Sequence, residues 1–86
     1  MANILDIKES LSMRMRARRR EGKITQIDMA ARSGVSLSSI KRFEQIGEIS
    51  LTSLLRLAAV LGYENDFDAL FSRKNYQSLD EIINEK

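Results

Sequence analysis

Side chains that can donate hydrogen bonds recur along residues 37–46. On a wheel at about 100° per residue, four of them fall within an arc of about 100°: Ser38, Lys41, Arg42 and Gln45. The apolar residues Ile40, Phe43 and Ile46 fall on the other side of the wheel. Lysine and arginine can donate hydrogen bonds to O6 and N7 of guanine, and serine hydroxyls can form hydrogen bonds with several bases. A helix with this polar face predicts entry into the major groove of duplex DNA.

The residues before this helix have the types needed to hold it against a second, shorter helix. Ala30 is small enough for another helix to cross closely above it, and Gly34 permits a backbone conformation that other residues resist. Val35 can fill the inside of the turn, while Ile40 and Phe43 anchor the later helix to a core. The pattern over residues 25–45 therefore predicts a helix-turn-helix.

The expected helices have recognisable start and stop signals. Thr25, Ser36 and Ser50 can each accept a backbone N–H in the first turn of a helix. Thr25 and Ser78 are also followed three residues later by an acidic residue, which is typical of a helix start. Glycines stand where the helices should stop, each in the left-handed conformation: Gly22, Gly34, Gly47 and Gly62.

Apolar residues recur at helical spacing between these signals. The stripes are Ile4, Ile7, Leu11 and Met15; Ile27, Ala30 and Ala31; Leu51, Leu54, Leu55, Ala58 and Leu61; and Phe67, Leu70 and Phe71. No stretch alternates at period two for long enough to predict a strand. The sequence therefore predicts an all-α fold. Five helices occupy a domain over residues 1–71, and a short helical appendage within residues 72–86 begins near Leu79.

The composition excludes most catalytic sites. The chain has no cysteine and no histidine, which rules out disulfides, zinc fingers, thiol nucleophiles and histidine-based acid–base chemistry. Glu64, Asp66 and Asp68 lack the glycine and the final glutamate of a calcium loop. We expect no enzyme activity, no cofactor and no metal. No apolar run approaches the about 20 residues of a membrane span, so we expect a cytoplasmic protein without a membrane partner.

The net charge of +2 conceals an asymmetry along the chain. Residues 1–62 carry eleven basic and six acidic residues, whereas residues 63–86 carry three basic and six acidic residues. A basic body favours a polyanionic partner. In the alternative interpretation the charges are ordinary solvated surface, and Ala30, Gly34 and Ile40 only pack a helical core.

The chain resembles the XRE-type helix-turn-helix family, which has the fold of lambda repressor and Cro. The resemblance covers roughly residues 8–62 and rests on Thr25-Gln26, Ala30, Gly34-Val35-Ser36, Ile40, Glu44 and the run from Ser50-Leu51 to Gly62. It implies that Gln26 contacts the DNA backbone. It also implies that Leu37, Ser38, Lys41 and Arg42 face bases or flanking phosphates. We expect Ser38, Lys41 and Arg42 to carry most of the base readout, with Leu37 and Gln45 secondary. Many relatives carry glutamine or arginine where this chain has Leu37 and Ser38, so the base preference stays open.

The arginines of the N-terminal segment point all around an expected helix, so they cannot form one DNA-facing stripe. The family resemblance implies that Arg19 pairs with Glu44 and fixes the first helix to the recognition helix. Arg14 and Lys23 are the candidates for phosphate contacts. Ser36 is expected to cap the recognition helix and to aim its N-terminus at DNA.

These expectations point to a sequence-specific regulator of transcription, and we expect a repressor that binds an inverted repeat as a homodimer. The end of the chain also resembles HipB-like antitoxins in the pattern GYENDFDALFSRKNYQSLDEI. The alternative is therefore an interaction protein that restrains a HipA-like kinase toxin through residues 72–86. Those residues could instead contact a second copy of the chain.

Overall fold

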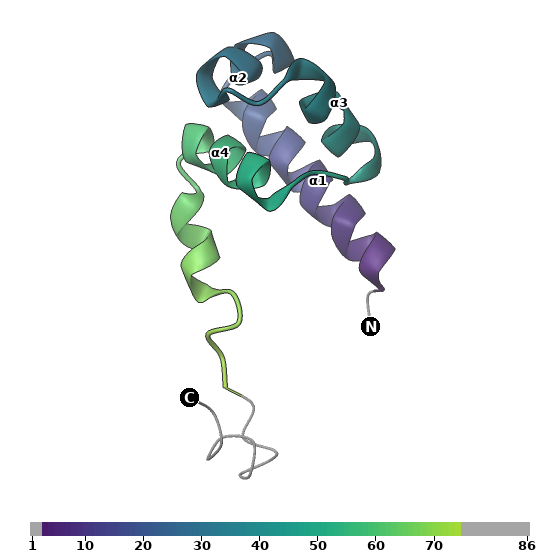
Figure 1. The fold of residues 1–86 in the computed structure, drawn as a ribbon, viewed down its shortest axis with the longest axis vertical. Helices are drawn as coiled ribbons and strands as arrows, with labels where there is room; N and C mark the ends of the chain where they lie inside the picture. The colour runs from purple at the N-terminus through teal and green to yellow at the C-terminus, as the bar shows by residue number, and fades with distance from the viewer. Residues whose placement is uncertain (1–2, 75–86) are drawn as a thin grey trace.

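The computed structural model describes residues 3–74, which form a bundle of short helices (Figure 1). The elements are α1 (Ile4–Glu21), α2 (Gln26–Ser33), α3 (Leu37–Ile46), α4 (Leu51–Leu61) and the 3-10 helix η1 (Glu64–Ala69). The described part contains no strand, so the prediction of an all-α, five-helix, lambda-repressor-like domain is confirmed. None of the described helices is long and apolar enough to cross a membrane.

A side-chain oxygen caps the N-terminus of each of the four α-helices. The predicted caps are confirmed: Thr25 accepts from the Asp28 amide at 3.0 Å, Ser36 from the Ser39 amide at 3.2 Å, and Ser50 from the Ser53 amide at 3.1 Å. Asn3 caps α1 in the same way, accepting from the Asp6 amide at 2.8 Å, and was not predicted. Each cap satisfies a backbone donor that has no partner within the helix.

All four glycines follow the last residue of a helix as predicted, but only three of them are left-handed. Gly34, Gly47 and Gly62 have φ values of 76°, 74° and 82°. Gly22 has φ −78° and ψ 0°, so the prediction of a left-handed Gly22 is wrong. The backbone stays close to helical through Gly22, and the left-handed turn falls on Lys23, at φ 55°.

Because a left-handed backbone costs an L-residue with a Cβ atom about 1–2 kcal/mol, Lys23→Gly is expected to stabilise the domain. The expected gain in the free energy of unfolding is about 0.5–1 kcal/mol, since glycine also loses more chain entropy on folding. Urea denaturation followed by circular dichroism measures it. Lys23→Ala is the control, because it removes the charge and keeps the strained backbone. An equal gain in both variants would assign the effect to the charge.

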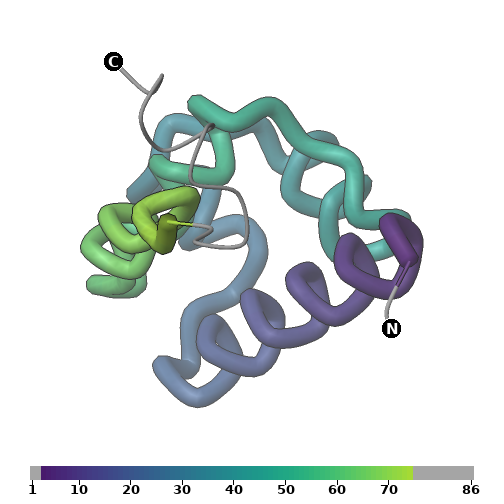
Figure 2. The backbone as a smooth tube through the Cα atoms, turned by 90° about the horizontal axis from the view of Figure 1, so that it is seen from below, coloured from purple at the N-terminus to yellow at the C-terminus, as the bar shows by residue number. Residues whose placement is uncertain are grey.

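The core lies where α1, α3 and α4 meet beneath α2. Its buried members are Met29, Val35, Ile40, Phe43, Leu54, Leu57 and Ala58. Both α1 and α2 pack on α3 and on α4, whereas η1 packs on α4. Viewed from below, the helices surround this core while η1 lies to one side (Figure 2). Helix α3 is therefore packed on two sides, by α1 and by α2.

Several residues of the predicted apolar stripes lie outside the core. On α1 the core covers Leu11 and Met15 but leaves Ile4 and Ile7 exposed, because α2, α3 and α4 do not extend over the first turns. On α2, Met29 takes the buried position expected of Ile27, which is exposed, as is Ala31. Both differences come from how far the neighbouring helices reach, which periodicity does not specify.

The later stripes need similar corrections. Ile46 and Leu51 lie at the two sides of the α3–α4 connection and are exposed, and Leu57 rather than Leu55 is buried in α4. In the expected fifth helix only Phe67 packs on the core. Leu70 and Phe71 are 57% and 100% exposed, because η1 ends at Ala69 and the chain turns away at Leu70. The predicted start signal at Ser78 and the helix from Leu79 lie outside the described residues.

Candidate nucleic-acid interface

One face of α3 is exposed to solvent along its whole length. Ser38, Lys41, Arg42 and Gln45 are exposed, while Ile40 and Phe43 on the other side are each only 1% exposed. Leu37 lies half-buried at the edge between the two faces. This is the face predicted from the sequence to contact DNA, and nothing in the described part of the chain covers it.

Ser36 organises the N-terminal end of this face. Its hydroxyl accepts from the Ser39 amide and donates to the Ser39 hydroxyl at 2.8 Å. The Ser36 and Ser38 hydroxyl oxygens lie 3.2 Å apart. The cap satisfies one amide of the first turn, and the serine hydroxyls gather at the end of α3 that would lie nearest the base edges.

The turn between α2 and α3 fixes the position of α3. The Gly34 amide donates to the Ala30 carbonyl at 3.0 Å, and the Val35 amide donates to the Ser33 hydroxyl at 3.1 Å. Val35 is 4% exposed inside the turn, and the half-buried Ala30 packs against the same core. The small residue, the glycine and the buried valine thus stand where a tight turn between two helices requires them.

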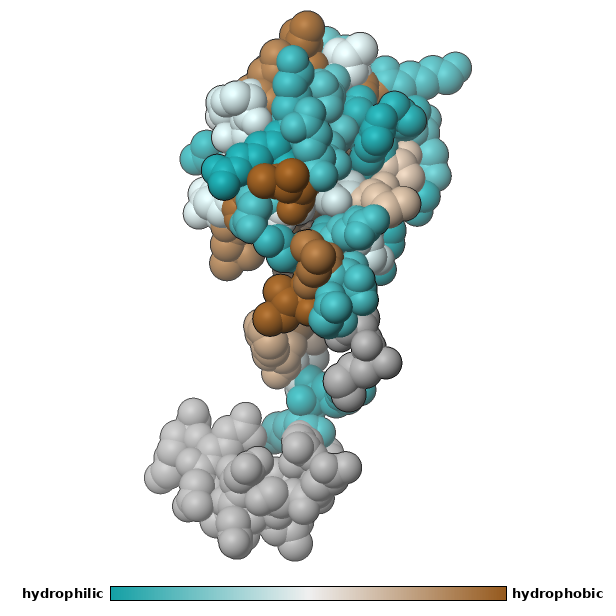
Figure 3. All heavy atoms as spheres, turned by 90° about the vertical axis from the view of Figure 1, so that its right-hand side faces the viewer, coloured by the Kyte–Doolittle hydropathy of each residue, from teal (hydrophilic) through white to brown (hydrophobic). Residues whose placement is uncertain are grey.

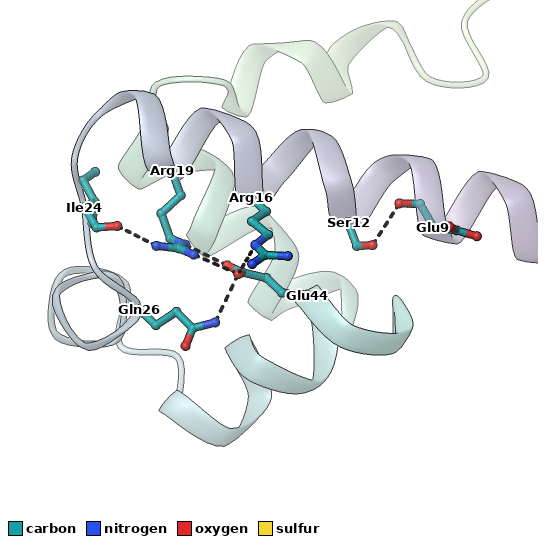
Figure 4. A network of polar contacts seen from close by, with 7 residues as sticks. All are labelled: Glu9, Ser12, Arg16, Arg19, Ile24, Gln26 and Glu44. Carbon is teal, nitrogen blue, oxygen red and sulfur yellow. Dashed lines mark hydrogen bonds and ion pairs between the residues drawn. The ribbon is translucent and has the colours of Figure 1, made fainter.

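Glu44, on the buried side of α3, lies at the centre of a polar network (Figure 4). Arg19 binds it with two parallel hydrogen bonds, from Nε to Oε2 at 2.8 Å and from Nη2 to Oε1 at 2.9 Å. Arg19 Nη1 donates to the Ile24 carbonyl at 2.7 Å. The side chains of Arg19 and Glu44 are 9% and 4% exposed. A bidentate pair fixes the relative orientation of the two side chains as well as the distance between them. Because this pair is also buried, it holds α1 against α3.

The same carboxylate holds Gln26. Gln26 Nε2, in the first turn of α2, donates to Glu44 Oε1 at 3.1 Å. Arg16 Nε approaches that oxygen at 3.9 Å, and the Arg16 side chain is 48% exposed. Arg16 was not among the predicted site residues, although its position three residues before Arg19 places it on the same side of α1. The network therefore brings two side chains with accessible donors, Gln26 and Arg16, to the junction of α1, α2 and α3.

The two predicted phosphate contacts lie in different places on α1 and in the turn after it. Arg14 lines a shallow depression on α1 with Asp6, Glu9 and Met13, on a different side of the helix from Arg16 and Arg19. Lys23 is exposed in the turn after α1 and directly precedes Ile24, whose carbonyl accepts from Arg19. Within the described residues, no hydrogen bond or ion pair joins the side chain of Arg14 or Lys23 to Glu44.

Arg42 also belongs to a second group of charges, at the connection between α3 and α4. It lines a depression with Ser39, Glu48 and Ser50. A hydrogen bond from Lys8 and the charge of Lys8 lower the pKa of Glu48, and the charge of Arg42 adds to this effect. Glu48 pairs with Lys8, and its negative charge lies near the exposed Arg42.

The family follows from the comparison with known proteins. The helix-turn-helix family model matches residues 15–65, more than half of the chain, including Arg16, Arg19 and the whole of α2, α3 and α4. The chain belongs to the XRE-type helix-turn-helix family, whose domains bind DNA and regulate transcription. No curated protein and no solved structure matches the chain.

Proposed function

We propose that this protein is a sequence-specific repressor that binds double-stranded DNA as a homodimer on an inverted repeat. The observation that carries the proposal is the exposed polar face of α3, backed by the buried Ile40 and Phe43. A rigid helix whose donors stand free can meet base edges without a conformational change. No cofactor or metal is needed for this binding, and such a protein would act in the cytoplasm.

The contacts divide into those that read bases and those that grip the backbone. Ser38, Lys41 and Arg42 are proposed to carry most of the base readout, with Leu37 and Gln45 secondary. Gln26 is proposed to grip a phosphate while Glu44 holds its amide, and Arg14 and Lys23 are further phosphate candidates. Ser36 acts by capping α3.

Two copies are proposed because half-sites about one helical turn apart, roughly 34–36 Å, double the contacts that a small domain can make. In this arrangement residues 1–71 form the DNA-binding domain, and residues 72–86 contact a second copy of the chain or another protein.

Selection of bound sites from random duplexes tests the proposal directly. An inverted repeat is the expected result, and a flat sequence profile would contradict specific recognition.

Arg42→Ala is expected to weaken binding to the selected site by about 5–150-fold, the equivalent of about 1–3 kcal/mol. If Arg42 reads a guanine, the loss should be confined to one base-pair position of the half-site. Fluorescence anisotropy with a set of single-substituted duplexes measures it at two salt concentrations.

Arg20→Ala is the matched control, since it removes the same charge from an exposed position of α1. A loss spread evenly over all duplexes, with a salt slope smaller by about one, would make Arg42 a phosphate contact instead. Equal losses in the two variants would remove Arg42 from the interface.

A second candidate is an antitoxin-type protein that binds a HipA-like kinase through residues 72–86 and regulates its own gene. The observation that favours a protein partner is the exposure of Leu70 and Phe71, directly before that segment. Ending the chain after Ser72 separates the two candidates. Loss of partner binding with DNA binding retained would support this second function.

A further inference from the structure

Arg16 lies at the edge of the buried network around Glu44, with about half of its side chain in solvent. Its Nε is 3.9 Å from Glu44 Oε1, which is beyond hydrogen-bond distance, and the side chain is 48% exposed. Figure 4 shows Arg16 approaching this carboxylate from α1 and Gln26 approaching it from α2. Arg16 therefore presents accessible guanidinium donors at the junction of α1, α2 and α3.

The charge of Arg16 is not needed to balance this carboxylate. Arg19 already neutralises Glu44 and binds both of its oxygens, while Gln26 donates to Oε1 and brings no charge. The ionised side chains of Arg16, Arg19 and Glu44 therefore leave one positive charge in excess. Because Arg19 and Glu44 are buried, this charge reaches solvent at Arg16. A half-exposed guanidinium held in this way is suited to bind an anion from outside the protein.

The neighbouring arginines of α1 are placed differently. Arg18 pairs with Glu21 at 2.7 Å and lies about 160° from Arg16 on a helical wheel. Arg20 lies only about 40° from Arg16, but among the described residues it forms no ion pair with Glu44. Of these three exposed arginines, Arg16 is the one that the network holds.

Arg16 and Gln26 lie close enough together to bind one phosphate group. Gln26 Nε2 and Arg16 Nε are 3.1 Å and 3.9 Å from the same oxygen, Glu44 Oε1, which limits the distance between the two nitrogens. Because a hydrogen bond is about 2.9 Å long, donors up to about 8 Å apart can bind two oxygens of one phosphate. Gln26 Nε2 has a second N–H, and the terminal nitrogens of Arg16 have theirs, so neither side chain has to leave Glu44.

A phosphate at this junction would lie beside the exposed face of α3. Glu44 follows Lys41 by three residues, so the two side chains lie about 60° apart around α3. Seen from the side of Figure 1 on which α3 lies, the surface of the helical body is largely hydrophilic and is interrupted by apolar groups (Figure 3). A hydrophilic surface with an excess positive charge can approach the backbone of duplex DNA while α3 enters the groove.

We propose that Arg16 and Gln26 bind the same phosphate of the DNA backbone, with Glu44 positioning both donors. This assignment rests on the proposed function, the binding of duplex DNA, and adds Arg16 to its backbone contacts. A phosphate held by two helices at once fixes the register of α3 in the groove, although it reads no base.

Neutral backbone substitution locates the contact. In the duplex obtained by site selection, each phosphate of one half-site is replaced in turn by an uncharged methylphosphonate, and binding is measured by fluorescence anisotropy. The unsubstituted protein should lose affinity at several positions. Arg16→Ala and Gln26→Ala should both become insensitive to replacement at one position, the same in the two variants. Arg18→Ala is the matched control, since its side chain is similarly exposed at 41%, and it should keep the unsubstituted pattern.

The dependence of binding on salt measures the charge of the contact. Arg16→Ala should lower the log–log salt slope by about 0.9 and weaken binding by about eightfold at 0.1 M salt, equally for all base sequences. Arg16→Lys keeps the charge and should restore the slope. Gln26→Ala removes no charge, so it should weaken binding without changing the slope. Urea denaturation should give the same midpoint for Arg16→Ala as for the unsubstituted protein, because Arg16 is half-exposed.

Two results would overturn the shared contact. One is an Arg16→Ala variant that keeps the full salt slope, and the other is insensitivity of Arg16→Ala and Gln26→Ala at different phosphates. In both cases sequence-specific binding by the unsubstituted protein would leave the proposed function standing. An unsubstituted protein that shows no preference among duplexes would instead contradict the proposed function, and the shared contact would fail with it.

Discussion

Arg19→Met is expected to destabilise the domain by about 3–5 kcal/mol, a large part of the stability of a chain this small. The substitution leaves the Glu44 carboxylate, with its side chain 4% exposed, without the partner that binds both of its oxygens. Gln26 and Arg16 cannot replace Arg19, since they approach only Oε1, at 3.1 Å and 3.9 Å. Urea denaturation, followed by circular dichroism, measures the change.

Arg18→Met is the control for the loss of an arginine in α1. Arg18 pairs with Glu21 at 2.7 Å in an exposed position, so its replacement should cost about 1 kcal/mol or less. The double variant Arg19→Met with Glu44→Leu should recover most of the lost stability, because it removes the buried charge together with its partner. Similar losses for Arg18→Met and Arg19→Met would show that the pair contributes no more than a surface contact.

The network also connects stability to the proposed interface. Glu44 lies one residue before Gln45 and two after Arg42, on the side of α3 that faces α1 and α2. Its carboxylate sets the rotation of α3 about its own axis and, through Gln26, the orientation of the first turn of α2. The pair of Arg19 and Glu44 therefore positions the exposed face rather than contacting DNA, and variants of either residue should affect folding and binding together.

The helix-turn-helix could be predicted from the sequence because its signals are local. Ser36 and Thr25 act within one turn of their own helices, and Ala30, Gly34 and Val35 describe a turn closed by neighbouring residues. The exposed face of α3 could be predicted from residue spacing alone. If Ile40 and Phe43 face the core, Lys41 and Arg42 must lie on the opposite side of the helix.

The remaining features depend on contacts between distant segments. Periodicity shows which side of α1 carries Ile4 and Ile7, but the lengths of the packed helices decide that this end stays uncovered. The left-handed turn falls on Lys23 rather than on Gly22 because the helical backbone continues one residue further. The hydrogen bond from Gln26 to Glu44 joins residues on two helices, and only their relative placement reveals it.

Gly47→Ala is the other substitution with a large expected effect, a loss of about 2–5 kcal/mol. Two causes combine. The backbone of Gly47 has φ 74°, a conformation that costs alanine about 1–2 kcal/mol. A Cβ atom at this position would also lie 2.9 Å from Lys8 Cβ and 3.1 Å from the Lys8 carbonyl oxygen. Because the carbonyl belongs to the backbone of α1, relief requires the end of α3 to move away from α1.

Gly62→Ala separates these two causes. Gly62 has a similar backbone, at φ 82°, but a Cβ atom there would meet nothing within 4 Å. Its substitution should cost only the conformational part, about 1–2 kcal/mol. The difference between the two variants in urea denaturation therefore measures how tightly α3 is seated on α1. Equal losses would mean that α1 can shift at Lys8 without a loss of stability. That result would contradict the rigid placement of α3 on which the proposed recognition of DNA depends.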